Sequence, residues 1–241
     1  TQDKEDADIA FFSSDSQLPG NSDLIDKVPT VAYVWGWMPS RMLAREYRLP
    51  ILNHLEWLNR CTRVLVPSPT TQEHLAMLAT ESLICHPGID TKTLEEHAPP
   101  VVEKKAYLAF LSRLDRQKGL SLLIQAASLL TPRLPIIAMG PGNQEPYQAE
   151  ADRLGVPIRF EQPTDAEKVI RLAEAAILVH PSQYEGFGLP PCEALFLRTP
   201  VIALDTPHLR WLLAESAFYC STPDNLAGTL VHILDNYDTI S

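Results

Sequence analysis

Two glutamates, Glu185 and Glu193, flank a glycine loop and a proline pair in the stretch Glu-Gly-Phe-Gly-Leu-Pro-Pro-Cys-Glu. Glycines let the backbone approach a ligand closely, and prolines suit the first turn of a helix. We therefore predict a helix after the loop, with Glu193 in its first turn, where unpaired N–H groups attract anions. Carboxylates accept hydrogen bonds from hydroxyls. The motif thus predicts a pocket edge for a ligand with both phosphate and hydroxyl groups, as in a nucleotide sugar.

A basic loop, residues 112–119, lies between an apolar run and an amphipathic stretch. Doubly wound sheets bind ligands beyond the carboxyl ends of their strands, so Arg113 and Lys118 in this loop can face a phosphate. A guanidinium engages two phosphate oxygens and an ammonium adds a point charge, so together they can stabilise a departing diphosphate. A solvated basic loop without a ligand is the alternative interpretation.

Gly140 and Gly142, on either side of Pro141, predict another close-approach loop after the next apolar run. By themselves these glycines are weak evidence, because glycine–proline turns are common. The three spaced glycines of a dinucleotide-binding fingerprint and the lysine motif of a phosphate loop are both absent from the sequence. We therefore predict no nicotinamide or flavin cofactor and no ATP hydrolysis.

The elements that position these loops follow from apolar periodicity. In the second half, short apolar runs alternate with amphipathic stretches, which predicts repeated βα units in a doubly wound parallel sheet. Residues 119–130 have apolar side chains at helical spacing and form the clearest helix. The first half repeats the pattern less completely, with helices expected at 50–60 and from about Thr70. We expect strands at residues 8–12, 30–34, 64–66 and 83–85, and then at 107–111, 135–139, 158–161, 176–180, 201–204 and 217–219.

A charged, proline-bearing stretch at residues 95–100 has the composition of a linker between two lobes. We therefore predict a first lobe over residues 1–98 and a ligand-binding lobe over residues 99–230. Residues 231–241 would form a C-terminal helix or tail that can return to the first lobe.

In order and spacing, these pieces resemble the retaining glycosyltransferases of family four. The likeness is strong over residues 106–236 and rests on the basic loop, the glycine–proline loop and the two-glutamate motif. Residues 63–68 and 86–90 resemble the end of that family's first lobe more faintly. The resemblance implies two Rossmann-like lobes of the GT-B type. It also implies transfer of a hexose from a nucleotide diphosphate sugar with retained configuration, without an essential metal or other cofactor.

The resemblance also implies roles for individual residues. Arg113 and Lys118 would hold the donor diphosphate and offset the charge on the leaving group, in the place that a metal ion fills elsewhere. Glu193 would accept hydrogen bonds from the ribose, and Glu185 would contact the donor sugar. The remaining donor-site candidates are Gly140, Gly142, Gly186, Phe187, Gly188 and Leu189.

The sequence departs from this family in its first lobe. Many relatives carry a histidine near the transferred sugar, whereas Trp35 occupies that position here. Trp35 and Trp37 are candidates for stacking on an acceptor, although packing is the commoner role of such tryptophans. Residues 206–211 replace a segment that often carries a glycine pair or a glutamate. The first lobe, of roughly ninety-five residues, is shorter than is usual in the family. The chain is therefore expected to be either a fragment or a compact enzyme with a reduced, truncated-looking acceptor lobe.

Two further functions stay open. A nucleotide-sugar-binding module without catalysis would explain the short lobe and the missing histidine. An epimerase or phosphorylase would need a first-lobe acid or a pyridoxal lysine, and neither is recognisable. The sugar, the base and the glycan, lipid or protein acceptor cannot be read from the motifs.

Composition narrows the class of protein. The formal charge of −10 argues against general binding to nucleic acid, and a polar start with no long apolar run predicts a cytoplasmic protein. Peripheral membrane contact through a locally basic first lobe stays open. Four scattered cysteines are expected to be reduced thiols, and the seven histidines show no metal-ligand spacing. The basic first-lobe residues are Arg41, Arg45, Arg48, Arg60 and Arg63.

Overall fold

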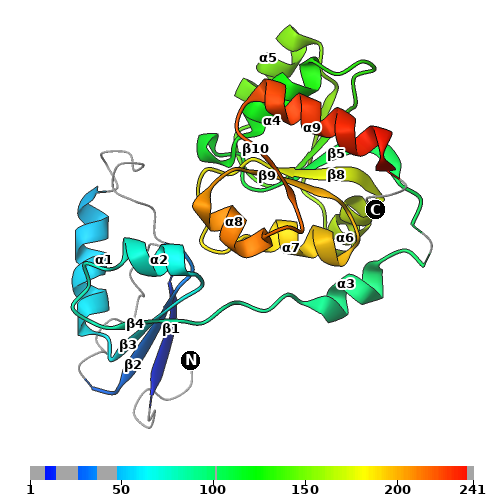
Figure 1. Cartoon of the computed structure of the whole chain (residues 1–241). Helices are drawn as coiled ribbons and strands as arrows, with labels where there is room; N and C mark the ends of the chain where they lie inside the picture. Colours follow the sequence, from blue (N-terminus) through cyan, green and yellow to red (C-terminus); the bar gives the residue numbers. More distant parts are fainter. Residues whose placement is uncertain (1–8, 15–26, 37–47, 101, 238–241) are drawn as a thin grey trace. The chain divides into compact units, whose positions relative to one another are not determined.

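A computed structural model describes residues 9–14, 27–36, 48–100 and 102–237 of the chain. The chain divides into two compact units, residues 1–88 with 185–187 and residues 89–184 with 188–241. Each unit has its own parallel sheet (Figure 1). The predicted α/β class with two Rossmann-like units is confirmed.

The described part of the first unit contains a four-stranded parallel sheet in the order β1-β2-β3-β4. Its core contains the buried side chains of Val34, Leu58 and Val64. Ser68 caps the second helix by accepting a hydrogen bond from the Thr71 N–H at 3.2 Å, which satisfies one unpaired donor of the first turn. The elements are β1 (Ala10–Ser14), β2 (Thr30–Val34), α1 (Arg48–Arg60), β3 (Arg63–Val66), α2 (Pro69–His74) and β4 (Ser82–Ile84).

The second unit contains a six-stranded sheet in the order β10-β9-β8-β5-β6-β7, with every pair parallel. The chain starts at β5 in the middle, builds outward to β7, and then returns to the other side of β5 with β8. The direction of winding therefore reverses between β5 and β8. The strands are β5 (Lys105–Leu111), β6 (Ile136–Met139), β7 (Ile158–Glu161), β8 (Ala175–His180), β9 (Val201–Leu204) and β10 (Phe218–Cys220).

Helices cover both faces of this sheet, with α4, α5 and α9 on one face and α6, α7 and α8 on the other (Figure 1). Successive residues of β5 point to opposite faces, so Leu108 and Phe110 enter one core while Tyr107 and Ala109 enter the other. This alternation explains why β5 and β8 read as continuous apolar runs. The helices are α3 (Thr91–His97), α4 (Leu120–Ser128), α5 (Glu145–Leu154), α6 (Asp165–Glu174), α7 (Leu189–Phe196), α8 (Pro207–Leu213) and α9 (Pro223–Asp235), with a 3-10 turn at Arg116–Lys118.

The boundary between the units lies after Gly88, whereas the sequence placed it at residue 98. The expected linker is instead partly helical, because α3 is capped by Asp90 and buries Leu94 in the core of the second unit. The C-terminal helix α9 also packs within the second unit, where Tyr237 donates a hydrogen bond to the Ala176 carbonyl at 2.9 Å. Residues 231–237 therefore belong to the second unit.

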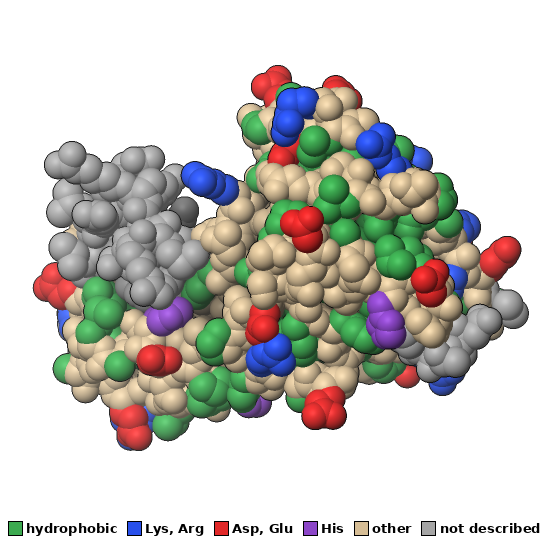
Figure 2. Space-filling model, turned by 45° about the horizontal axis from the view of Figure 1, so that its top comes forward, with side chains coloured by type: hydrophobic (Ala, Val, Ile, Leu, Met, Phe, Trp, Pro, Cys, Tyr) green, Lys and Arg blue, Asp and Glu red, His purple; other side chains and the backbone are tan. Residues whose placement is uncertain are grey.

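Charged side chains of both signs are interspersed over the described surface in view (Figure 2). Arg60 and Arg63 are exposed in the first unit, while Arg41, Arg45 and the Arg48 side chain lie outside the described part of the chain. Among the described helices, none combines the length and apolar character needed to cross a bilayer.

Candidate functional site

The point where the winding reverses lies at the carboxyl ends of β5 and β8. In open parallel sheets this is where ligands bind, because the loops that follow the two strands diverge there. The loop after β5 contains Arg113 and Lys118, and the loop after β8 leads into the two-glutamate motif. The structure therefore brings the basic loop and the residues that lead up to Glu185 to one edge of the second sheet.

Backbone hydrogen bonds connect the loops along this edge. Ser112 donates to the Met139 carbonyl at 3.0 Å and Leu114 donates to the Pro141 carbonyl at 2.8 Å, which joins the loops after β5 and β6. Gln183 donates to a carbonyl in the β5 loop at 2.8 Å, which joins that loop to the one after β8. The three loops form one hydrogen-bonded layer that can hold side chains in fixed positions.

Glycine is required in this layer for steric reasons. Gly140 and Gly142 have φ angles of 137° and 140°, in a region that other residues rarely adopt. A Cβ on Gly140 would collide with the Ser112 carbonyl, and a Cβ on Gly142 would lie 2.6 Å from that of Leu114. The predicted close-approach loop therefore brings its backbone against the neighbouring β5 loop.

Replacing Gly140 by alanine is expected to lower the free energy of unfolding by about 2 kcal/mol or more. Two costs add in this variant: alanine is strained at a positive φ, and its Cβ collides with the neighbouring loop. The matched control is Gly228→Ala, since Gly228 lies in α9 with nothing within 4 Å of the added Cβ. That variant should be stabilised by about 0.5–1 kcal/mol. Urea denaturation measures both, and equal midpoints for the two variants would contradict the packing of the loops.

Arg113 projects from the β5 loop with its side chain 64% exposed. Its guanidinium lies 3.2 Å from the Asp115 carboxylate, which is itself partly exposed. A pair this exposed contributes little to stability and can exchange its partner. Arg113 is therefore accessible to an anionic ligand.

Lys118 has a different environment, since it is only 8% exposed. Its Nζ donates to the Tyr184 carbonyl at 3.1 Å, and the Ser182 hydroxyl donates to the same carbonyl at 2.8 Å. The interpretation of Lys118 as part of a solvated loop is therefore wrong. This lysine fixes the path of the β8 loop just before Glu185.

Glu193 is the fifth residue of α7, so the expectation that it lies in the first turn is wrong. The helix begins at Leu189, because Gly188 adopts a φ of 112° as the N-cap and Pro190 follows in the first turn. Glu193 Oε1 accepts a hydrogen bond from Lys168 Nζ of α6 at 3.0 Å, and both side chains are mostly buried.

Lys168 is a residue that the sequence analysis missed. It is 22% exposed and lies 3.8 Å from Asp165 as well as next to Glu193. Its charge balances that of Glu193, and the pairing involves only one of the two carboxylate oxygens in the described structure. No motif could have revealed this contact, because it joins two helices that are separated by a strand and a loop.

The two-glutamate motif is divided between the units. Glu185, Gly186 and Phe187 group with the first unit, while Gly188, Leu189 and Glu193 belong to the second. The described second unit therefore fixes Glu193 by its own packing but does not by itself fix Glu185.

The first unit contains one of the two predicted acceptor residues within the described part of the chain. Trp35 is 43% exposed and follows β2; its indole N–H donates to Ser13 Oγ at 2.7 Å, and its ring lies 4.8 Å from that of Tyr33. Trp37 lies outside the described residues. The Trp35 ring is thus held at the end of β2 with part of its surface exposed.

Residues 206–211 form the start of α8, which Thr206 caps by accepting from the Leu209 N–H at 3.2 Å. Arg210 pairs with Asp205, with one contact at 2.8 Å, and lies over the Tyr219 ring. The Asp205 carboxylate and the Tyr219 ring therefore hold the Arg210 side chain in a local surface network.

The cysteines form no disulfide in the described structure. All four cysteines are free. Burial, followed by the Glu193 charge, raises the pKa of Cys192 to about 11, so its thiol stays protonated near neutral pH. Among the described residues, no group of three or more metal-ligand side chains comes together.

Comparison with known proteins agrees with this arrangement. Residues 92–238 match the profile of a family described as glycosyl transferases group 1. A D-inositol 3-phosphate glycosyltransferase from Mycobacterium sp. strain KMS is 32% identical over 168 residues, which cover 64% of this chain and 38% of that protein. A protein of the same name from Corynebacterium urealyticum is 35% identical over 122 residues, which cover 45% of this chain and 29% of that protein. The chain thus matches well under half the length of these relatives.

Solved structures show the same fold. Anabaena HepE in complex with UDP-glucose superposes with a TM-score of 0.78 at 17% identity, covering 96% of this chain and 70% of that one. A sucrose-phosphate synthase from Thermosynechococcus elongatus superposes with a TM-score of 0.71 at 19% identity, covering 87% and 59% respectively. At these identities the likeness establishes the GT-B fold alone.

Proposed function

Because the chain belongs to the glycosyl transferases group 1 family, whose members are retaining enzymes of the GT-B fold, we propose that it transfers a hexose from a nucleotide diphosphate sugar. The observation that carries this proposal is the placement of Arg113, the Gly140 loop and Glu193 along one edge of the second sheet. The edge would offer the Arg113 cation and the Glu193 carboxylate to a single ligand.

The proposed reaction breaks the bond between the anomeric carbon and the diphosphate oxygen. A hydroxyl oxygen of the acceptor bonds to the same carbon, and the hydroxyl proton passes to the departing diphosphate. The electron pair of the broken bond stays on the diphosphate, so negative charge grows on its leaving oxygen. Arg113 would stabilise that charge, and a preorganised donor of this kind acts most strongly as the charge develops. Lys118 would contribute its charge and hold the β8 loop, and Glu185 would contact the donor sugar.

Glu193 would bind the ribose of the donor. Lys168 Nζ holds Oε1 through a hydrogen bond, and Oε2 is then the oxygen that would accept from a ribose hydroxyl. This assignment needs no metal ion, since the cations of the protein would balance the diphosphate.

A uridine diphosphate sugar is the donor we favour, since HepE is a structural neighbour solved with UDP-glucose. Inositol phosphate is the first acceptor to examine, because the curated relatives are named for it. Glycans, lipids and proteins are the further acceptor classes.

A panel of UDP- and GDP-sugars tests the proposal, and release of the free nucleotide is the quantity measured. Each donor is assayed in the presence and absence of acceptor, and each assay is repeated in EDTA. Turnover of one donor that persists in EDTA is the expected result. Saturable nucleotide binding with neither transfer nor hydrolysis would favour a binding module without catalysis. The absence of both binding and turnover would contradict the proposal.

A further inference from the structure

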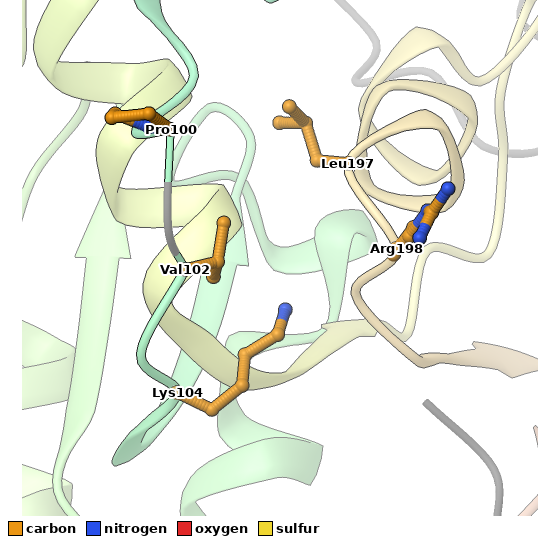
Figure 3. A pocket seen from close by; sticks show the side chains of 5 residues that line it. All are labelled: Pro100, Val102, Lys104, Leu197 and Arg198. Carbon is orange, nitrogen blue, oxygen red and sulfur yellow. The ribbon is translucent and has the colours of Figure 1, made fainter.

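A cavity of ≈ 440 Å³ opens in the second unit at the edge of the sheet opposite the loops described above (Figure 3). Lys104 directly precedes β5, and Arg198 lies between α7 and β9. Both residues are thus at the amino ends of strands, whereas the candidate donor loops follow the carboxyl ends. The cavity is lined by Pro100, Val102, Lys104, Leu197 and Arg198.

Lys104 directs its amino group toward the space between Val102 and the chain at Leu197 (Figure 3). Its Nζ donates to Thr199 Oγ1 at 2.7 Å, and that hydroxyl donates to the Leu172 carbonyl at 2.7 Å. Burial lowers the pKa of Lys104 to about 8. The ammonium is therefore partly stripped of water yet still charged at neutral pH, and an anion would stabilise it.

Arg198 adds a second cation from the other side of the cavity, where it lies beside Leu197 (Figure 3). It has a φ of 55° where the chain leaves α7, a position that favours glycine, and the Thr199 N–H closes the turn on the Ala194 carbonyl at 2.9 Å. Within the described residues, neither Arg198 nor Lys104 forms an ion pair with a carboxylate. Two cations thus line one cavity, and no carboxylate of the described residues pairs with either of them.

We propose that this cavity binds a small organic phosphate. The two cations match the double negative charge of a phosphate monoester, and a guanidinium can hold two of its oxygens. The apolar side chains of Pro100, Val102 and Leu197 would contact the organic part. The site is separate from the proposed donor site and does not depend on the proposed function.

Calorimetric titration at pH 7 with phenyl phosphate, inorganic phosphate and benzoate tests this site. Phenyl phosphate is expected to bind more tightly than inorganic phosphate, because only its ring reaches the apolar wall, and more tightly than benzoate, because its charge is doubled. Lys104→Met and Arg198→Gln are each expected to weaken phenyl phosphate binding by about tenfold or more, as expected for the loss of a charged hydrogen bond.

A control variant locates the binding. Lys92→Met removes a cation whose side chain is 84% exposed on α3, and it should leave phenyl phosphate affinity unchanged. Thermal unfolding checks that the cavity variants are folded, and Lys104→Met should be at least as stable as the wild type because it removes a partly buried charge. No saturable binding, binding that survives both cavity substitutions, or tighter binding of benzoate would overturn the proposal.

Discussion

Arg113→Ala is expected to lower the turnover of the nucleotide sugar by about 100- to 1,000-fold, the usual effect of removing one preorganised donor from a developing negative charge. The melting temperature should stay within about 2 °C of the wild type, because the pair of Arg113 with Asp115 is exposed and contributes little to stability. Release of nucleotide at saturating donor measures the first quantity, and a thermal scan measures the second.

Arg116→Ala provides the matched control for this prediction. Arg116 is exposed in the same loop, in the 3-10 turn, and its loss changes the net charge equally. Turnover should therefore be nearly unchanged in this variant. If both variants lose activity to the same extent, the loss comes from the lower positive charge of the loop as a whole, and the assigned role of Arg113 is wrong.

Glu193→Gln is expected to weaken binding of UDP by about 10- to 100-fold, because a charge-assisted hydrogen bond contributes about 1.5–3 kcal/mol. The substitution keeps the shape of the side chain but removes the charge that pairs with Lys168. If the carboxylate binds the ribose hydroxyls, 2′,3′-dideoxy-UDP, which lacks them, should bind the wild type more weakly than UDP does. The Glu193→Gln substitution should then not weaken binding of this analogue further. Calorimetry with both nucleotides measures the difference.

Asp165→Asn is the control for the Glu193 prediction. Asp165 is the other acidic neighbour of Lys168 at 3.8 Å, but it is 82% exposed at the start of α6. UDP affinity should not change in this variant, while Lys168→Met should weaken UDP more than the dideoxy analogue. Equal losses for both nucleotides in Glu193→Gln would show that Glu193 acts on folding or on another part of the ligand.

Much of the second unit could be predicted from the sequence, because strands β5, β6, β8 and β9 are largely buried. The runs at 158–161 and 201–204 coincide with β7 and β9, and the helix expected at 119–130 contains α4. Apolar periodicity reports burial directly, so these elements were visible without the structure. Strand order was not visible, and it determines which loops meet at the carboxyl edge.

The candidate site was predicted less completely. Gly140 and Gly142 were predicted as a close-approach loop, yet the surface they approach within the second unit is the β5 loop. Lys118 was predicted as a phosphate contact, with a solvated charge as the alternative, and its Nζ instead lies buried against the Tyr184 carbonyl. Lys168 gives no local signal in the sequence. Such contacts depend on tertiary packing between segments far apart in the chain. The roles assigned to Glu185 and Trp35 stay predictions.

The central claim is that a nucleotide diphosphate sugar binds along the carboxyl edge of the second sheet. Backbone ¹H–¹⁵N spectra recorded during a titration with UDP-glucose test it most directly. The account predicts saturable shifts concentrated in residues 112–119, 140–144 and 181–193, with little change around Lys104 and Arg198 on the opposite edge. Saturable shifts concentrated elsewhere, or no saturable shifts with any UDP- or GDP-sugar, would contradict it.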